Sequence, residues 1–477
     1  MKIILSNCIE IKEPTKEITD YVKKELTFKN PEYEKKRRMG FYAYGTPKEI
    51  KLYDCYNGSI YTPIGFFNKL FKVHPNINDY IDYSVEVHAD IKSGISLRDY
   101  QELAVPSVIN YKTGILNLPV GLGKTELALE CINRVQQKTI WLSHTGDLLN
   151  QSLDRCSKKM QCKISTITEG KCDISGDIVF ATVQTLYKYV ANGDIPQNTF
   201  GMLILDECHH ISANPNSIQL FRTCVDYFAC KYKIGLTATV HRADGMQDCI
   251  KAILGDVIYK IEKVGSDYRC VYEGKTLLTF PIDKFQVPAH IKVVETNYTL
   301  DGKNVFSKNG GTIQFGSLIS DIASNKSRNR LIIKTLNSIK GSTIVLSDRV
   351  EQLKYLCSNV KNGVQIDGST SKKARTKALE DVRNGKIKYL FASYSLAKEG
   401  LSVDILSNLV MATPVKDFAI VSQSIGRIQR PYEGKTIATV YDFTDDVGML
   451  LGFFSKRRAI YRKNNWSIEN MFLEGDV

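Results

Sequence analysis

The sequence predicts an α/β protein made of two consecutive parallel-sheet domains behind a small α+β module. Continuously apolar, strand-like runs alternate with stretches of helical periodicity, which is typical of parallel sheets covered on both faces. This pattern starts twice, once at Leu97 and again at Ser342. A length of 477 residues also suits two or three domains better than one. The segments we expect are a first module at 1–88, a domain at 89–262, a connector at 263–308, a domain at 309–455 and a basic tail at 456–477.

Residues 1–88 alternate short apolar runs with turn signals such as Asn57–Gly58, which favours a small module of strands and helices. The module contains a basic cluster, Lys35–Arg38, beside the aromatic residues Phe41 and Tyr42. Basic and aromatic side chains together are typical of contacts with a nucleic-acid backbone and its bases. A solvated helix end explains the same cluster equally well.

A strand, a glycine-bearing turn and a helix open the first domain at residues 114–132. The turn ends in Gly121-Leu122-Gly123-Lys124-Thr125 and matches a phosphate-binding loop, although Leu118 stands where the general pattern has glycine. The glycines let backbone N–H groups close around a polyphosphate at the start of the helix. We expect Lys124 to reach the β- and γ-phosphates of ATP and the Thr125 hydroxyl to bind Mg²⁺.

Two carboxylates follow the buried strand at 201–205, in the sequence Asp206-Glu207-Cys208-His209. Asp206 is placed to hold Mg²⁺ through the ion's water shell, because this ion keeps several waters and takes few carboxylates. Glu207 is placed to orient and deprotonate the water that attacks the γ-phosphate. We expect His209 to couple this site to its neighbours. The hydroxyls of Thr237 and Thr239, at the end of the next strand, are able to link the acidic motif to the bound strand.

In the second domain, Arg427 and Arg430 are three residues apart on a predicted helix and therefore share one face. Two guanidinium groups on one face can clamp a γ-phosphate, whereas an exposed basic helix face is the alternative. Residues 263–477 carry 32 Lys and Arg against 21 Asp and Glu, which accounts for 11 of the net charge of +13. This bias favours a polyanionic partner, nucleic acid before membrane.

The twelve cysteines are scattered without a Cys-x-x-Cys pair, which favours a reducing, cytoplasmic compartment over a zinc site. No apolar run approaches the ~18 residues of a membrane-spanning helix, and the first residues do not fit a signal peptide. We therefore expect no membrane partner.

Taken together and in this order, these residues resemble the superfamily 2 DExH-box helicases and translocases over about residues 95–450. The sequence after Thr237 resembles the XPB-like branch, although Ala243 stands where that branch often has an acidic residue. The first module and the end of the chain are similar to phage and large-DNA-virus members. The resemblance implies two RecA-like domains with ATP bound between them, Mg²⁺ as the metal, and a first module that recognises DNA.

The resemblance also assigns roles to individual residues. It implies adenine recognition by Arg98 and Gln101, nucleotide contacts by Gly400 and Asp404, and a catalytic role for Gln423 beside Arg427 and Arg430. It further implies contacts with the phosphates of the tracked strand for six residues: His144, Thr182, Gln184, Ser347, Arg349 and Thr413.

The function implied is an ATP-dependent helicase or translocase that unwinds or remodels forks, branched DNA or R-loops by stepping along one strand as a monomer. Three alternatives stay open. One is a double-stranded DNA translocase that does not separate strands, and another is a viral transcription-termination helicase acting on RNA or an RNA–DNA hybrid. The third is a non-motor binding protein with a degenerate ATPase, against which the intact Lys124, Asp206 and Glu207 argue.

Overall fold

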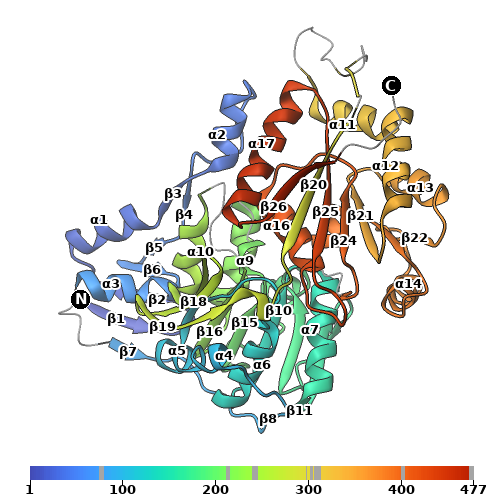
Figure 1. Cartoon of the computed structure of the whole chain (residues 1–477). Coiled ribbons are helices and arrows are strands. Elements are labelled where there is room, and N and C mark those ends of the chain that lie inside the picture. Colours follow the sequence, from blue (N-terminus) through green and yellow to red (C-terminus); the bar gives the residue numbers. More distant parts are fainter. Residues whose placement is uncertain are drawn as a thin grey trace. The chain divides into compact units, whose positions relative to one another are not determined.

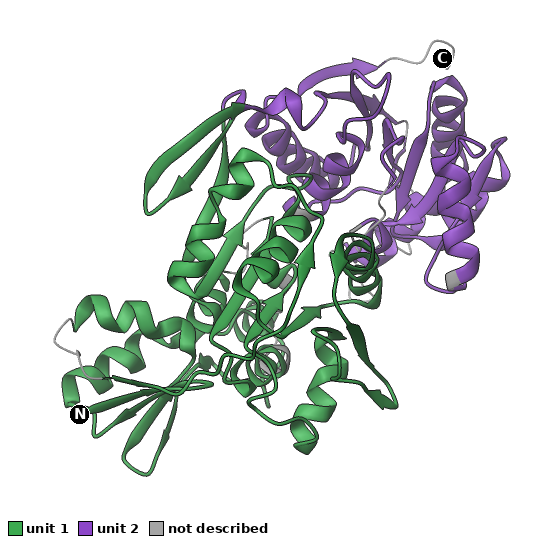
Figure 2. Ribbon diagram, turned by 90° about the horizontal axis from the view of Figure 1, so that it is seen from below, with its two compact units in different colours: residues 1–264, 268–280 green, residues 265–267, 281–477 purple. Residues whose placement is uncertain are grey.

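The computed structural model describes residues 1–74, 80–210, 215–238, 245–296, 298–300, 305, 313–398 and 403–471. The chain forms two compact units, each built on its own sheet (Figures 1 and 2). Unit 1 comprises residues 1–264 and 268–280, and unit 2 comprises residues 265–267 and 281–477. The predicted α/β class with two tandem parallel sheets is confirmed.

Unit 1 contains a ten-stranded sheet in the order β13-β12-β14-β10-β15-β16-β9-β17-β18-β19. The strands from β12 to β17 pair in parallel, whereas β13 runs antiparallel to β12. The central strands are buried, as their continuously apolar sequences require. The strands are β9 Thr113–Asn117, β10 Thr139–Ser143, β12 Ile164–Thr168, β13 Lys171–Cys172, β14 Ile178–Thr182, β15 Met202–Leu205, β16 Tyr232–Thr237, β17 Val257–Val264, β18 Asp267–Tyr272 and β19 Lys275–Pro281.

Helices connect these strands and place polar residues at the carboxyl ends of the strands. Thr145 and Thr182 begin two of the helices by accepting hydrogen bonds from backbone N–H groups three residues on. The helices are α4 Asp99–Glu102, α5 Val105–Tyr111, α6 Lys124–Val135, α7 Gly146–Lys159, α8 Val183–Asn192, α9 Pro215–Tyr227 and α10 Gln247–Leu254. A two-stranded pair, β8 Lys92–Ser93 with β11 Met160–Gln161, completes the domain.

The front module also belongs to unit 1 and has a five-stranded sheet in the order β5-β6-β2-β1-β7 beside a β3–β4 pair. Its helix α2 stands at the end of the β3–β4 pair, away from the larger sheet (Figure 1). The elements are β1 Lys2–Leu5, β2 Ile9–Lys12, α1 Lys16–Glu25, β3 Thr27–Lys29, α2 Pro31–Arg38, β4 Glu49–Lys51, β5 Asp54–Tyr56, β6 Ser59–Thr62, a 3-10 turn Ile64–Phe66, α3 Phe67–Val73 and β7 Tyr80–Asp82.

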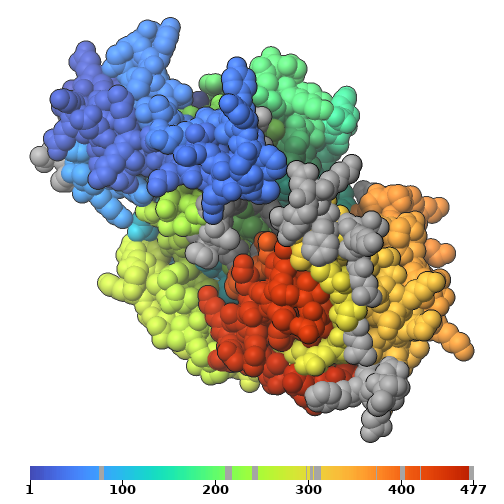
Figure 3. Space-filling model, turned by 90° about the horizontal axis from the view of Figure 1, so that it is seen from above, coloured from blue at the N-terminus to red at the C-terminus, as the bar shows by residue number. Residues whose placement is uncertain are grey.

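The front module packs directly on the first parallel-sheet domain (Figure 3). One hydrophobic cluster contains residues of both. Contact is close at Gly65, where an added Cβ would lie 2.2 Å from the backbone nitrogen of Gly255. The fully buried Lys233 donates hydrogen bonds of 2.9 Å to the carbonyls of Asn7 and Val225. The front module is therefore a fixed part of unit 1.

Unit 2 contains a seven-stranded parallel sheet in the order β22-β23-β21-β24-β25-β20-β26. Successive residues of β21 face different cores, because Ile344 and Leu346 pack in one cluster and Val345 in another. The strands are β20 Ala289–Glu295, β21 Thr343–Ser347, β22 Gly363–Gln365, β23 Tyr389–Ser393, β24 Asn408–Met411, β25 Ala438–Thr444 and β26 Ser467–Met471. The helices are α11 Phe315–Ser324, α12 Lys326–Ser338, α13 Val350–Ser358, α14 Lys372–Arg383, α15 Tyr394–Lys398, α16 Phe418–Ile428 and α17 Gly448–Lys463.

The structure differs from the expected boundaries in two places. Most of the expected connector at 263–308 is strand: β18 and β19 extend the first sheet and β20 lies in the second. The expected basic tail at 456–477 holds the last turns of α17 and the strand β26, because Arg457, Ile460 and Tyr461 are buried. The glycine-bearing run Asn309-Gly310-Gly311 predicts a hinge between the domains near Lys303 to Gly311, and of these residues only Val305 is among those that the structure describes. Among the described helices, none combines the length and apolar composition that crossing a membrane requires.

Candidate nucleotide and nucleic-acid sites

The phosphate-binding loop leads directly into α6, which begins at Lys124, the residue before Thr125. Gly121 and Gly123 have φ angles of 88° and 72°, the left-handed region that glycine adopts without strain. A Cβ on Gly123 would lie 2.6 Å from Nε2 of Gln101, so the loop and this side chain are in close contact. No side chain of the described residues caps the start of α6, and the first backbone N–H groups of a helix suit an anionic phosphate.

Gln101 and Tyr100 stabilise the phosphate-binding loop by hydrogen bonds to its backbone carbonyls. The Gln101 amide donates to the carbonyls of Leu122 (3.3 Å) and Gly123 (3.0 Å) and accepts from the backbone N–H of Arg98 (3.0 Å). The Tyr100 hydroxyl accepts from Arg98 and donates to the Leu122 carbonyl. Gln101 is only 4% exposed, and in this structure its amide shapes the loop. Arg98, by contrast, is an exposed residue.

Lys124 meets the acidic pair at the end of β15. Its Nζ atom lies 3.2 Å from Oε1 of Glu207, and both side chains are largely buried. Asp206 accepts hydrogen bonds from the Ser152 hydroxyl (3.2 Å) and from the Glu207 backbone N–H (2.9 Å). Glu207 has a φ of 47°, an uncommon value for a residue with a side chain, and such strained residues cluster at functional sites. The structure thus brings together three predicted residues, Lys124, Asp206 and Glu207.

The electrostatics of this cluster fit a divalent cation. Burial and then the neighbouring Glu207 raise the pKa of Asp206 to about 6, against the opposing effects of Lys124 and the Ser152 hydrogen bond. Two adjacent buried carboxylates with one ammonium group leave the pair short of positive charge. A Mg²⁺ ion held through water by Asp206, with a further oxygen ligand from the Thr125 hydroxyl in the first turn of α6, would supply that charge.

His209 links the acidic pair to the neighbouring strand. Its Nδ1 atom lies 2.9 Å from the Thr237 hydroxyl at the end of β16 and 3.2 Å from Oε2 of Glu207. The carbonyl of Thr237 accepts a 3.0 Å hydrogen bond from the backbone N–H of Leu118, at the start of the phosphate-binding segment. Thr237 therefore connects the acidic motif to the phosphate-binding segment, whereas the expected link from its hydroxyl to a bound strand stays a prediction. Thr239, Ala243 and the residues between them lie outside the described residues.

Three of the residues assigned to nucleic acid gather at the carboxyl ends of β10 and β14. These strands are neighbours, and Ser143 and Thr182 are paired in register. Nε2 of Gln184 lies 3.5 Å from Nδ1 of His144, whose ring stacks on Phe221 at 6.1 Å. The Thr182 hydroxyl accepts from the backbone N–H of Thr185 and so begins α8. His144, Thr182 and Gln184 thus lie at one edge of the sheet.

In unit 2, α16 carries Gln423 and Arg427, which are 8% and 9% exposed. Arg430 lies beyond the end of this helix at Ile428, so the expectation that both arginines share one helical face is wrong. Its guanidinium instead donates to Oδ1 of Asp404 at 3.0 Å. Gly400 lies outside the described residues.

Lys435 links the loop that contains Asp404 to the residues after α16. No sequence motif had indicated this lysine. Its ammonium group donates to the carbonyls of Asp404 (3.0 Å), Leu406 (2.7 Å) and Arg430 (2.8 Å). Burial is the main cause that lowers the pKa of Lys435 to about 8. Ser152 and Tyr100 were missed likewise, because their contacts join residues far apart in sequence.

Ser347 and Thr413 are fully buried, which contradicts their assignment to nucleic-acid contacts. The Ser347 hydroxyl donates to Gln352 (2.6 Å) and accepts from the Arg349 backbone N–H (3.0 Å). The Thr413 hydroxyl accepts from the backbone N–H of Asp348 at 2.9 Å. Both hydroxyls therefore shape the loop after β21. Arg349 donates from Nε to the Ser320 hydroxyl (3.0 Å) and from a terminal nitrogen to the Gly316 carbonyl (2.9 Å).

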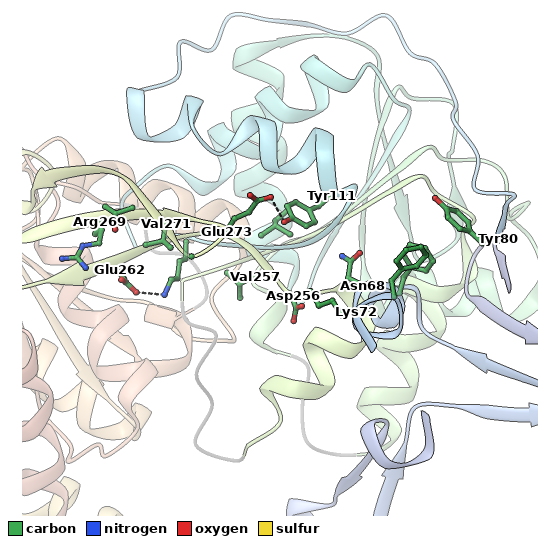
Figure 4. A pocket seen from close by; sticks show the side chains of 16 residues that line it. Asn68, Lys72, Tyr80, Tyr111, Asp256, Val257, Glu262, Arg269, Val271 and Glu273 are labelled. Atoms are coloured by element: carbon green, nitrogen blue, oxygen red, sulfur yellow. Dashed lines mark hydrogen bonds and ion pairs between the residues drawn. The ribbon is translucent and has the colours of Figure 1, made fainter. Parts of the chain in front are cut away.

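A separate pocket of about 1040 Å³ lies in unit 1 between the front module and the β17–β18–β19 strands (Figure 4). One wall is aromatic, with Phe67, Phe71 and Tyr80 in contact at ring distances of 5.2–6.3 Å. Its charges are balanced, with Lys72, Lys260 and Arg269 against Asp256, Glu262 and Glu273. Lys260 pairs with Glu262, and Tyr111 donates to Glu273. Among the described residues, none of those assigned to nucleotide or nucleic acid lines this pocket.

Comparisons with known proteins agree with the order of the motifs. Residues 94–242 match the family "Type III restriction enzyme, res subunit", and residues 327–431 match "Helicase conserved C-terminal domain". The chain is 26% identical over 486 residues to "Probable helicase D10" of Escherichia phage T5, covering 100% of this chain and 98% of that protein. It is 26% identical over 428 residues to "DNA 3'-5' translocase XPB2" of Sulfurisphaera tokodaii, covering 83% and 89%.

Among solved structures, S. cerevisiae Dbp5 bound to RNA and ADP BeF3 matches with a TM-score of 0.56 at 16% identity, covering 79% of this chain and 90% of that chain. This likeness concerns the fold alone and confirms two tandem RecA-like domains. The two helicase domains, the full-length phage relative and the order of the motifs agree with one another. The chain belongs to the superfamily 2 helicases, as an ATP-dependent enzyme related to phage helicases.

Proposed function

We propose that this protein steps along one strand of DNA, driven by ATP hydrolysis, and so unwinds or remodels forks, branched DNA and R-loops. The observation that carries the proposal is the convergence of Lys124, Asp206 and Glu207 at the start of α6. DNA is favoured over RNA because the relatives from Sulfurisphaera tokodaii and phage T4 are named a DNA translocase and a DNA helicase, whereas the mimivirus relative, named a putative RNA helicase, supports the RNA alternative.

The nucleotide's phosphates are proposed to bind at the start of α6, where backbone N–H groups, Lys124 and Thr125 offer donors and positive charge. In the structure Lys124 is paired with Glu207. A bound phosphate would compete for Lys124 and release the Glu207 carboxylate, which then accepts a proton from the attacking water. Bound Mg²⁺, held through Asp206 and Thr125, would neutralise charge on the phosphate oxygens.

We propose that Gln423 and Arg427 of α16 act on the same phosphates, because a guanidinium stabilises the charge that develops in phosphoryl transfer. Arg430 is proposed to act through Asp404, to which it is paired. This division gives the two arginines different roles. Arg427 contacts the nucleotide, and Arg430 holds the loop that contains Asp404.

The tracked strand is proposed to lie across the carboxyl ends of β10 and β14. The helices α7 and α8 both start there, and their first N–H groups favour phosphates. His144 and Gln184 lie at the same edge and supply further polar contacts. Contacts of this kind hold the backbone and not the bases, so binding is tolerant of sequence and sensitive to salt.

The front module is proposed to bind the branched or duplex part of the DNA through α2 and the residues after it. The last turn of α2 contains four basic residues, and none of its residues is buried. Phe41, Tyr42 and Tyr44 follow it and are 61%, 96% and 96% exposed. Exposed aromatic rings beside basic groups suit stacking on unpaired bases at a junction.

The test compares ATP turnover and strand separation on fork, Holliday-junction, R-loop and RNA-duplex substrates at one salt concentration. We expect stimulation of ATP turnover by DNA and separation of the branched DNA substrates. Stimulation by RNA alone would support the RNA-displacing alternative. Movement on duplex DNA without strand separation would identify a double-stranded DNA translocase, and no turnover with any substrate would indicate a non-motor protein.

A further inference from the structure

The segment between β24 and α16, residues 412–417, is irregular, yet its backbone carbonyls are held by buried side chains from three helices. Arg328 of α12 donates to the Ala412 carbonyl at 2.5 Å. Tyr394 of α15 donates to the Thr413 carbonyl at 2.8 Å. Arg457 of α17 donates to the Val415 carbonyl at 2.8 Å. Three of four consecutive carbonyls therefore have a partner that is itself buried.

Both arginines are fixed by carboxylates on or next to β25, the neighbour of β24. Arg457 forms two hydrogen bonds of 2.8 and 2.9 Å with Asp442, which also accepts from the Tyr461 hydroxyl at 2.7 Å. Arg328 forms two hydrogen bonds of 2.7 and 3.2 Å with Asp445. Each guanidinium thus reaches a carboxylate with two nitrogens and the segment with its third.

The two ion pairs act from different sides of the sheet. Residues of α12 pack in the cluster that contains Val345, whereas residues of α17 pack in the cluster that contains Ile344. Asp442 is also paired in register with Met411, the last residue of β24. The segment is therefore held between both faces of the sheet and its neighbouring strand.

Fixing this segment also fixes the start of α16, because the last residue of the segment, Asp417, is the N-cap of that helix. Asp417 accepts a 3.0 Å hydrogen bond from the backbone N–H of Ile420. Gln423 and Arg427 follow on α16 within three turns. A shift of the segment would move both side chains together, since a helix moves as a rigid body over this length.

We propose that Arg328, Tyr394 and Arg457 are positioning residues that fix the segment 412–417 and thereby set where α16 presents Arg427 for hydrolysis. Buried ion pairs stabilise proteins little compared with well-packed apolar side chains, so two pairs directed at one segment favour a geometric role. The inference rests on the proposed role of Arg427 and assigns residues that lie outside every motif described above.

Two tyrosines offer a matched test within unit 2. Tyr394 and Tyr389 are 2% and 3% exposed, and each donates its hydroxyl to one backbone carbonyl, of Thr413 (2.8 Å) and Leu336 (2.6 Å) respectively. Tyr394→Phe and Tyr389→Phe each delete one buried hydroxyl, so their effects on stability should be similar. Only the first releases the segment before α16.

We expect Tyr394→Phe to lower kcat for nucleic-acid-stimulated ATP hydrolysis by about tenfold or more, since small displacements of catalytic groups cost this much. The KM for ATP should stay at the wild-type value, and Tyr389→Phe should keep the wild-type kcat. Arg457→Lys should lower kcat further while the fold, checked by circular dichroism, is retained. Hydrogen exchange should rise in residues 412–428 of Tyr394→Phe and Arg457→Lys, and not in Tyr389→Phe.

Equal kcat values and equal exchange in the two tyrosine variants would overturn the inference. The outcome is separable from the proposed function, because that function fails if wild-type protein shows no stimulated ATP turnover. In that case hydrogen exchange of α16 still decides whether these residues position the helix. If wild type is active and Arg427→Ala is inactive, but Tyr394→Phe behaves as Tyr389→Phe, only the inference falls.

Discussion

The Nζ atom of Lys124 lies 3.2 Å from Oε1 of Glu207, and this contact joins the start of α6 to the end of β15. Each residue thereby compensates the charge of the other in a largely buried site. A bound phosphate would take Lys124 as its partner and leave Glu207 available as a base. The proposed function depends on this exchange of partners.

Thr237→Val should uncouple strand separation from ATP hydrolysis. The substitution keeps the shape of the side chain but removes the hydroxyl that lies 2.9 Å from Nδ1 of His209. We expect ATP turnover to stay near the wild-type rate, while strand separation per ATP falls by roughly tenfold, in the range of typical coupling energies. The measurement is unwinding of a labelled fork alongside ATP turnover.

A suitable control is Thr139→Val, because Thr139 is also buried in the same sheet and donates to the Gln137 carbonyl at 2.7 Å, away from the site. It should unwind the fork at the wild-type yield per ATP. Equal losses in both variants would show that the Thr237 hydroxyl contributes only to stability.

Asp206 should make Mg²⁺ binding depend on pH. Its pKa is raised to about 6, mainly by burial, so the carboxylate is increasingly protonated below that pH. We expect the apparent affinity for Mg²⁺ in ATP turnover to weaken as the pH falls from 7 to 5. Titration of Mg²⁺ at each pH measures this effect, and an affinity that does not change over this range would contradict the assignment.

The same pKa predicts how stability changes with pH. The folded state binds the Asp206 proton more tightly than the unfolded state, so this group's contribution is full below about pH 4 and is lost as the pH rises through about 6. The full effect is on the order of 3 kcal/mol. Asp206→Asn should therefore gain stability relative to wild type between pH 4 and 7, in urea unfolding without Mg²⁺ or nucleotide. A constant difference would be inconsistent with the raised pKa.

Charge reversal on α2 should weaken DNA binding without affecting the ATP site. Arg37→Glu with Arg38→Glu removes two exposed positive charges and adds two negative ones. We expect a lower affinity for branched DNA and a shallower dependence of the affinity on salt, with unchanged turnover at saturating DNA.

The matched control for α2 reverses Lys23 and Lys24, two exposed lysines in the last turn of α1 in the same module. Fluorescence anisotropy with a labelled junction compares both pairs across a salt series. If the α1 and α2 variants bind equally well, α2 is an ordinary solvated helix end.

Much of the fold was accessible from sequence, because strands such as Thr139–Ser143 and Met202–Leu205 are buried on both faces and so are apolar throughout. The structure of the end of the chain could not be predicted in this way. The basic composition after residue 456 suggested a tail, but Arg457 is buried against Asp442. A buried arginine with a distant partner looks like a surface arginine in sequence.

In the candidate site, too, some residues could be predicted from the sequence and others could not. Residues next to one another in a motif, such as Asp206 and Glu207, were found because a strand end places both at one edge of the sheet. Contacts such as Ser152 with Asp206 join separate segments and leave no local pattern. Burial decided the remaining cases, since Ser347 and Thr413 carry hydroxyls suited to phosphates but point into unit 2.

The rate of DNA-stimulated ATP hydrolysis by Glu207→Gln tests the central claim most directly. The variant keeps the shape of the side chain and removes the base, so we expect kcat to fall by about a hundredfold or more. Lys124→Ala should also abolish turnover, with weaker nucleotide binding, and circular dichroism should match wild type in both. Turnover within a few-fold of wild type in Glu207→Gln would contradict the account, because the carboxylate paired with Lys124 would then have no part in hydrolysis.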